Sequence, residues 1–378
     1  MNRYYRTSLI VGGLVLLVGA LDLAALPPGN AGSGEALVRQ GMKGMVQRGE
    51  IIGGVAGIYQ DGQTKFVAVG KKFTSDSAAP DANTVYEIGS ITKVFTSAFL
   101  AKAVVENKIK LKDSIDSHLP SYTHLRPEVQ GKITFERLAT FTASLPRKQP
   151  PRFKTAREVL GQFLSHWTPR APIGSVDKYS NLSYEMLAYL TPQIEHTTYD
   201  HLLNDFICNP LGMTHTHPDT EISSETNRAY GVTKSGQKTS YTRASWDGVP
   251  FITSTAADME KFLEACLGVT PGSPKLQQAL ALASKPYFPM AHGNQQGLAW
   301  VVHSVSAPGG TVTLISKDGI ADGQHSLIVF DPQAKSGVVF LTNRDDSKQG
   351  KEPPLFPLAR HLLTGVAPSG SGGGGEAN

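Results

Sequence analysis

The chain has 378 residues, of which 40% are hydrophobic, and its 36 basic residues nearly balance its 32 acidic residues, giving a net charge of +4. That length and apolar content suffice for a large core, while the small net charge and the lack of any run of five like charges argue against nucleic acid as a partner. The two cysteines, Cys208 and Cys266, are far apart and predict buried free thiols rather than a disulfide framework or a metal motif.

The N-terminal segment has the pattern of an export signal. Arg3 and Arg6 precede an apolar run from Leu9 to Leu21, and small, turn-forming residues follow at 27–32. Asp22 ends the run before it reaches the roughly 18 to 20 residues of a membrane span, which favours a cleaved signal over an uncleaved anchor. The anchor stays as the alternative. The expected division of the chain is a signal peptide or membrane anchor with its linker over 1–33, one folded domain over 34–366, and a disordered Gly/Ser-rich tail over 367–378.

Two short runs after the N-terminal segment predict a β-hairpin. Val55–Tyr59 and Lys65–Val69 have strand-like patterns, and Asp61-Gly62 between them is typical of a tight turn. We expect this hairpin to share an antiparallel sheet with strands from the other end of the chain.

Ser90-Ile91-Thr92-Lys93 leads into an apolar-periodic stretch at 94–99 that predicts a helix. Residues three apart lie on one helix face about a turn from each other, so the Lys93 amine can reach the Ser90 hydroxyl. Because a serine hydroxyl is a weak nucleophile until a neighbouring base takes its proton, the pair predicts an activated serine. The alternative is a helix-capping serine followed by a solvated lysine.

Tyr179-Ser180-Asn181 follows the loop 171–175 and opens a helical pattern that includes Leu182, Met186, Leu187 and Leu190. This places a phenol and an amide at a helix start, where they are available for polar contacts. The surrounding region, about 100 to 245, is predicted to be mainly helical.

Four strand-like runs follow near the C-terminus, at Leu298–His303, Val312–Ser316, Ser326–Phe330 and Val338–Thr342. The second ends in Lys317-Asp318-Gly319, a lysine beside a glycine at which another backbone can approach closely. We expect an α+β fold in which both chain ends form an antiparallel sheet and a mainly helical lobe is inserted between them. That arrangement would bring Ser90, Tyr179 and Lys317 into one cleft.

In this order, the S-x-x-K, Y-x-N and K-x-G segments resemble the signature elements of the penicillin-recognising serine hydrolases, which include class C β-lactamases, D-alanyl-D-alanine peptidases and related esterases. The segments 138–150 and 209–216 resemble two further stretches of that family, so the resemblance covers most of residues 40 to 365. Within the family, 145–150 and 297–301 are most similar to the AmpH-type D,D-carboxypeptidase/endopeptidases. The resemblance implies a β-lactamase/transpeptidase-like fold over 34–366.

The resemblance also implies roles for the site residues. Ser90 would attack the substrate carbonyl, with its own N–H and that of Ile320 forming the oxyanion hole. Lys93 and Tyr179 would share the general-base task, and Lys317 would add positive charge that favours the phenolate. Substrate contacts would come from the Asn181 amide and from the 318–320 segment, that is Asp318, Gly319 and Ile320.

Three positions depart from the family pattern. Phe141 stands where a histidine is usual, Ser144 replaces a small Gly or Ala, and Asp318 stands where threonine is common. In the family, the residue at that last position lies near the carboxylate of a penicillin or of a terminal D-alanine. An aspartate pointing into the cleft would therefore disfavour substrates with a free carboxylate; alternatively, it turns away along the strand and bonds a neighbouring donor.

These observations leave three hypotheses for an exported protein. The first is a periplasmic D-alanyl-D-alanine carboxypeptidase/endopeptidase that forms an acyl-enzyme on Ser90, the second a class C-like β-lactamase or an esterase, and the third a non-catalytic cell-envelope binding protein. The substrate would be a small molecule or a peptidoglycan peptide, no cofactor or metal is expected, and an uncleaved N-terminus would associate with the membrane. H-E-x-x-H and G-x-S-x-G do not occur, and His215 and His217 are expected to be a loop pair rather than metal ligands.

Overall fold

The computed structural model describes residues 34–75, 78–218, 226–239, 251–270, 273–344 and 354–367. The expected signal or anchor at 1–33 and all but the first residue of the expected tail at 367–378 lie outside the described residues. Within the described ranges, every helix is too short or too polar to cross a membrane.

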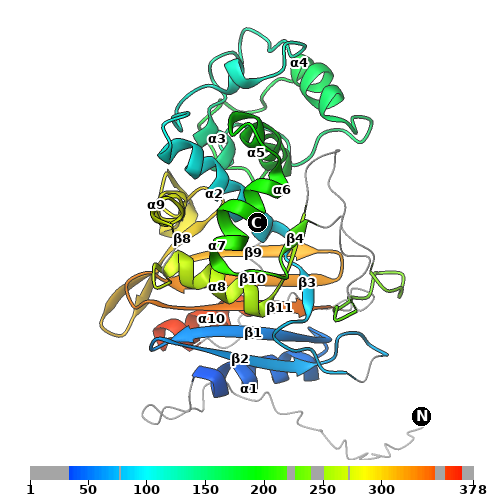
Figure 1. The fold of residues 1–378 in the computed structure, drawn as a ribbon, viewed down its shortest axis with the longest axis vertical. Helices are drawn as coiled ribbons and strands as arrows, with labels where there is room; N and C mark the ends of the chain where they lie inside the picture. Colours follow the sequence, from blue (N-terminus) through cyan, green and yellow to red (C-terminus); the bar gives the residue numbers. More distant parts are fainter. Residues whose placement is uncertain are drawn as a thin grey trace, which may run out of the picture.

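The central element is an eight-stranded antiparallel sheet in the order β2-β1-β11-β10-β9-β8-β7-β6 (Figure 1). Its strands are β1 (Gly53–Gln60), β2 (Gln63–Gly70), β6 (Phe288–Pro289), β7 (Gln295–Gln296), β8 (Val301–Ala307), β9 (Gly310–Ala321), β10 (Gln324–Asp331) and β11 (Ser336–Asn343). The predicted hairpin is confirmed as β1 and β2, and β1 pairs with β11, so both chain ends build one sheet. The strand predicted from Leu298 begins only at Val301, because the Gly297 N–H donates to the Trp300 carbonyl and closes a turn.

Helices cover both faces of this sheet. The helices α1 (Gly34–Gln47) and α10 (Leu355–Thr364) pack on one face, and α8 (Ala256–Leu267) packs against β1 and β11 on the other. Successive strand residues alternate between the two layers, so Phe340 enters the core beside α1 and α10 whereas Leu341 enters the core beside α8. Each such side chain contributes about 1.5 to 3 kcal/mol when it is fully buried.

The inserted lobe is built around α2 (Thr92–Val105), which contacts α5 (Asn181–Ile194) and α9 (Pro274–Ala283). Eleven of the 14 residues of α2 are buried, as expected for a helix that is apolar on all sides and lies at the centre of a lobe. The shorter helical segments, with η marking 3-10 or π turns, are η2 (Ile115–His118), α3 (Phe135–Ala139), η3 (Glu158–Phe163), α4 (Leu164–His166), α6 (Tyr199–His201), η4 (Leu202–Cys208), α7 (Asn209–Leu211) and η6 (Ala291–Gly293).

Long irregular segments separate these helices. Most of 106–134 and 140–157 is turn and loop, and this part of the chain contains prolines at 120, 127, 146, 150 and 151. Proline lacks the backbone donor and restricts the preceding residue to extended conformations, so helices cannot continue through these positions. Residues 140–150 therefore form an irregular loop of the lobe rather than a helix.

A second, three-stranded sheet was not predicted from the sequence. It has the order β3-β5-β4, with β3 (Val85–Glu87), β5 (Ile252–Thr255) and β4 (His217–Pro218). Strands of two to four residues carry too little periodicity to be recognised from a sequence. Its importance is positional, because β3 ends directly before the turn that holds Ser90.

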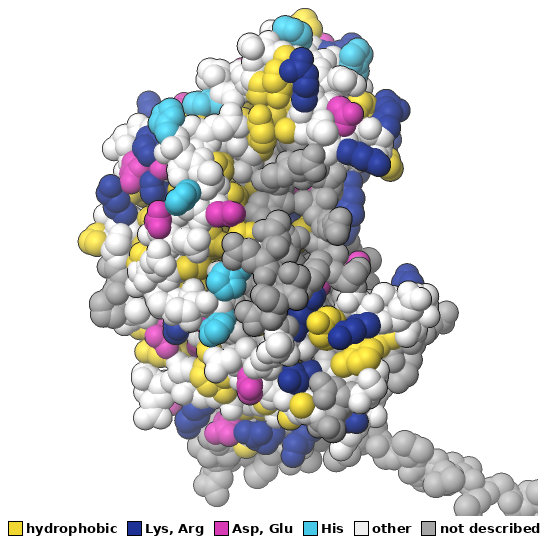
Figure 2. All heavy atoms as spheres, turned by 45° about the vertical axis from the view of Figure 1, so that its right-hand side comes forward, with side chains coloured by type: hydrophobic (Ala, Val, Ile, Leu, Met, Phe, Trp, Pro, Cys, Tyr) yellow, Lys and Arg dark blue, Asp and Glu magenta, His cyan; other side chains and the backbone are white. Residues whose placement is uncertain are grey.

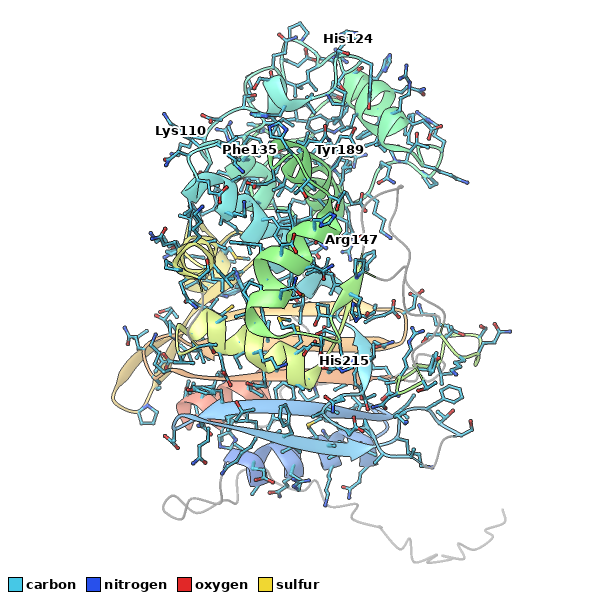
Figure 3. All side chains as sticks on the ribbon, viewed as in Figure 1. Lys110, His124, Phe135, Arg147, Tyr189 and His215 are labelled. Carbon is cyan, nitrogen blue, oxygen red and sulfur yellow. The ribbon has the colours of Figure 1, made fainter. Side chains whose placement is uncertain are left out.

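The two cysteines and His215 lie outside that turn. Both cysteines are free, as predicted; Cys208 is buried and Cys266 is partly exposed. His215 donates its backbone N–H to the Asp258 carboxylate at 2.7 Å, and it is labelled in Figure 3. Within the described part of the chain, no group of three or more His, Cys, Asp or Glu side chains is placed to hold a metal ion. The expectation of chemistry without a metal stays a prediction.

Candidate active site

Ser90 lies at the start of the central helix. The short turn η1 (Gly89–Ile91) carries the chain from β3 into α2, so Ser90 precedes Lys93 by about one helical turn, as predicted. The preceding residue anchors the turn: the Ile88 N–H donates to the Ile252 carbonyl at 3.1 Å, and the Ser326 hydroxyl donates to the Ile88 carbonyl at 2.8 Å. The nucleophile candidate is therefore fixed from both sheets.

Two glycines allow this turn to touch β9. Gly89 has a φ of +51°, and a Cβ placed on it would lie 2.7 Å from the Ile320 carbonyl oxygen and 2.8 Å from the Ile320 nitrogen. On the opposing strand, a Cβ on Gly319 would overlap the Ile88 carbonyl oxygen. The close backbone approach predicted at Gly319 is thus present, and it brings the main chain of Ile320 next to Ser90.

The strand that contributes Lys317 is longer than its sequence indicated. Its β-branched run ends at Ser316, yet β9 continues to Ala321 because residues 317–321 pair with β10. On its other edge, β8 pairs with β9 only as far as Ser316. On that edge, the segment 317–321 therefore borders η1 instead of a second strand.

Tyr179 reaches Ser90 from the start of α5. Ser180 caps this helix by accepting from the Ser183 N–H at 3.1 Å, and its hydroxyl donates to the Pro146 carbonyl at 2.7 Å. The next residue, Asn181, donates its N–H to the Arg147 carbonyl at 2.9 Å. These bonds hold the helix start against the 145–150 segment and aim the phenol at the serine.

The structure brings Ser90, Tyr179 and Lys93 together at hydrogen-bonding distance and places Lys317 nearby. The Tyr179 hydroxyl lies 2.6 Å from Ser90 Oγ, and Lys93 Nζ donates to the same Oγ at 3.1 Å. Lys317 Nζ lies 5.6 Å from the centroid of the Tyr179 ring, and Lys93 Nζ lies 5.2 Å from it. Both lysines are almost completely buried.

Burial and the short distances between these groups change the pKa values of Lys93 and Tyr179. Burial lowers the pKa of Lys93, against the opposing effect of Tyr179. Burial alone would raise the pKa of Tyr179, but Lys93 and Lys317 outweigh it and hold this pKa below its usual value near 10. The arrangement therefore favours a deprotonated partner beside Ser90, which is what a serine nucleophile requires.

Lys317 forms an ion pair with the next residue in the chain, Asp318. Its Nζ donates to both the backbone carbonyl and the Oδ1 of Asp318, each at 2.8 Å. Burial alone would lower the pKa of Lys317, but Asp318 and Tyr179 outweigh it and raise this pKa, while Lys317 in turn lowers the pKa of Asp318 to about 2. By register Asp318 belongs to the opposite sheet face, across from Leu327, yet its carboxylate bends back to the Lys317 ammonium. Asp318 thus bonds a neighbouring donor, and this donor is the cation of the candidate site.

Two further residues contact Tyr179 that received no role from the sequence. The Phe141 ring, in the position where the family has histidine, lies 4.8 Å from the Tyr179 ring, centroid to centroid. The Arg147 guanidinium carbon lies 5.5 Å from the Tyr179 centroid. Both belong to the segment that resembles the family, and the basic residue directly after Leu145-Pro146 was the available signal for Arg147. Its distance from the phenol could come only from the folded chain.

The fold and this serine-centred site define a class of enzyme, the β-lactamase-type serine hydrolases. The sequence pattern of the family described as "Beta-lactamase" matches residues 35–356, and the chain belongs to this family. A β-lactamase from Lysobacter lactamgenus is 25% identical over 366 residues, which cover 89% of this chain and 94% of the relative.

Solved structures agree with this assignment. A class C β-lactamase superposes with a TM-score of 0.78 at 21% identity, covering 88% of this chain and 97% of that one. The D-alanine carboxypeptidase AmpC from Burkholderia cenocepacia superposes with a TM-score of 0.74 at 25% identity, covering 88% and 99% respectively. The predicted α+β, β-lactamase/transpeptidase-like fold is confirmed, whereas the closer similarity to AmpH-type enzymes stays a prediction.

Proposed function

We propose that this protein is an exported D-alanyl-D-alanine carboxypeptidase/endopeptidase that cleaves peptidoglycan peptides through an acyl-enzyme on Ser90. The observation that carries the proposal is the contact of Ser90 Oγ with both the Tyr179 hydroxyl, at 2.6 Å, and Lys93 Nζ, at 3.1 Å. D-alanine carboxypeptidase activity is also named for two solved relatives, from Burkholderia cenocepacia and Pseudomonas syringae. The N-terminal pattern supports export to the periplasm.

In the proposed reaction, Ser90 Oγ attacks the carbonyl carbon of the scissile peptide bond while its proton passes to the Tyr179–Lys93 pair. The carbonyl oxygen becomes negative in the tetrahedral intermediate and is stabilised by the N–H groups of Ser90 and Ile320; losing one such donor costs about 3 to 4 kcal/mol. The carbon–nitrogen bond then breaks, and the leaving amine takes the proton back from Tyr179. Water, deprotonated by the same pair, finally hydrolyses the Ser90 ester.

A β-lactamase or esterase is the second candidate, and it is favoured by the β-lactamase relatives. Both activities use the same acyl-enzyme and differ in the acyl group and in the rate at which water releases it. A binding protein without turnover is the third candidate; the preserved Ser90, Lys93 and Tyr179 contacts argue against it, because such a protein has no need of an activated serine.

Intact-protein mass spectrometry tests the proposal. The protein is incubated with benzylpenicillin, a D-Ala-D-Ala peptide and the C-terminal amide of that peptide, and the products are followed by chromatography. We expect an acyl adduct on the Ser90 peptide and release of the terminal residue from at least one of the peptides. Ser90→Ala should give neither adduct nor product. A label on another residue, for example Ser180, would overturn the assignment of the nucleophile, and a rapidly released penicilloyl adduct without peptide cleavage would identify a β-lactamase instead.

A further inference from the structure

Two cations from different parts of the fold lie near the reacting groups. The Arg147 guanidinium carbon lies 5.5 Å and Lys317 Nζ 5.6 Å from the centroid of the Tyr179 ring, whose hydroxyl contacts Ser90. Arg147 belongs to the loop after Leu145-Pro146 in the helical lobe, whereas Lys317 belongs to β9. A substrate bound at Ser90 therefore lies near one cation from the helical lobe and one from β9.

The cation on β9 is already neutralised. Lys317 Nζ makes two 2.8 Å hydrogen bonds to Asp318, one of them to its carboxylate, and the Lys317 side chain is only 4% exposed. The Asp318 carboxylate is about half exposed, so it is the charge that an incoming ligand meets at this end of the site. An anionic group of a substrate would have to approach a carboxylate there, which is unfavourable.

The charge of Arg147, in contrast, is not neutralised by a carboxylate of the described residues. Its backbone is fixed because its carbonyl accepts from the N–H of Asn181 at 2.9 Å, while the residue as a whole is exposed. Within the described ranges, no carboxylate pairs with its guanidinium. In Figure 3 it lies between the helical lobe and the sheet, and Figure 2 shows further Lys and Arg side chains along the border of the lobe above the indentation of the surface. A fixed backbone with a free, planar donor group is suited to carboxylate recognition.

We propose that Arg147 binds a carboxylate in the acyl part of the substrate, and that Asp318 selects an uncharged leaving group. The orientation rests on the proposed function and on the resemblance, which implies that Asn181 contacts a substrate amide and that position 318 lies near the carboxylate of a terminal D-alanine, at the end of the leaving group. Arg147 is bonded to Asn181 through its carbonyl and belongs to the helical lobe rather than to β9, so we assign it to the acyl side. The preferred substrate is then a peptide with an anionic acyl side chain and an internal, amidated or esterified leaving group. This favours endopeptidase over carboxypeptidase action.

Four matched D-Ala-D-Ala peptides test this inference. They carry either a carboxylate or its amide on the acyl-side side chain, and either a free or an amidated C-terminus, and kcat/KM is measured for each. The wild type should prefer the acyl-side acid by about tenfold or more, the range that a hydrogen bond to a charged group contributes. It should prefer the amidated C-terminus by a similar factor, because the Asp318 carboxylate repels a free one.

Variants assign the two preferences to their residues. Arg147→Gln should bring the acid-to-amide ratio at the acyl side towards one, and Arg147→Lys should restore part of it. Asp318→Asn should raise the relative use of the free C-terminus by about tenfold. Lys148→Gln, which removes a neighbouring exposed cation that contacts neither Tyr179 nor Asn181, is the matched control and should leave both ratios unchanged.

The outcomes separate this inference from the proposed function. If no peptide is cleaved and none acylates Ser90, the proposed peptidase activity is wrong. If peptides are cleaved but Arg147→Gln leaves the acyl-side ratio at its wild-type value, Arg147 does not recognise the substrate. An equal loss in Arg147→Gln and Lys148→Gln would also overturn the inference, because general surface charge would then be responsible.

Discussion

Tyr179 contacts most of the groups that form this site. Its hydroxyl contacts Ser90, the ammonium groups of Lys93 and Lys317 lie within 6 Å of its ring centroid, and Phe141 packs against the ring. The two cations outweigh burial and lower the pKa of the phenol, which makes it a stronger candidate for the base than an ordinary tyrosine.

Replacing Tyr179 by phenylalanine should preserve the fold and lower kcat/KM by about 10² to 10⁴, the usual effect of removing a positioned base. The ring and its packing against Phe141 remain, so thermal unfolding should stay close to that of the wild type. Tyr287→Phe is the control, because this phenol donates to the Leu282 carbonyl outside the site. Acylation of Tyr179→Phe at the wild-type rate would assign the base to another group.

At the scale of elements, the site depends on the contact between η1 and β9. Gly319 and Gly89 lie on the two sides of this contact, and each faces backbone atoms of the other element where a side chain would begin. The contact sets the distance between the Ser90 and Ile320 N–H groups, and an oxyanion hole requires both donors near one oxygen position. A small displacement here is therefore more damaging to activity than to folding.

Gly319→Ala should lower kcat/KM by at least about 10², because the added methyl group overlaps the Ile88 carbonyl and pushes η1 away from β9. Gly62→Ala is the matched control. Gly62 has a φ of +73° in the β1–β2 turn, and nothing lies within 4 Å of the added Cβ, so this variant should cost about 1 to 2 kcal/mol of stability and no activity. Steady-state kinetics measure the activity of both variants, and chemical denaturation measures their stability. Equal activity in the two would show that the η1–β9 contact tolerates displacement.

At the scale of the whole molecule, one acid is buried in the core between α8 and β1. Glu260 is 1% exposed, and Gly57 on β1 leaves room for its side chain. Among the described residues, neither of its carboxylate oxygens has a hydrogen-bond partner. Burial, with a further contribution from Glu264, raises its pKa well above the usual value. The folded state therefore retains this proton more strongly than the unfolded state does.

A raised carboxyl pKa makes folding less favourable as pH rises, because the unfolded chain releases the proton first. The loss begins near the unfolded pKa of about 4.3 and continues up to the folded pKa. Glu260→Gln should remove this dependence. We therefore expect the melting temperature of the variant, relative to the wild type, to increase from pH 5 to pH 8. Glu264→Gln, at a partly exposed neighbour whose carboxylate accepts hydrogen bonds from Thr64 and Thr270, is the comparison. A difference independent of pH would contradict a buried, protonated Glu260.

The sequence by itself determined the features that depend on near neighbours in the chain. The spacing of Ser90 and Lys93 on a helix start, the start of α5 beside Tyr179, and the β1–β2 hairpin all follow from local periodicity and turn chemistry. The resemblance of the segments in their order then indicated the fold, which the solved relatives confirm.

The tertiary structure alone decided what depends on distant parts of the chain. Residues 317–321 extend β9 because β10 supplies hydrogen bonds, not because of their own propensity. The bend of Asp318 back to Lys317, the position of Arg147 over Tyr179 and the burial of Glu260 are likewise set by packing between elements. The physical reason is that local propensities act over a few residues, whereas the direction of a side chain and the charge it meets are fixed only when remote segments pack together.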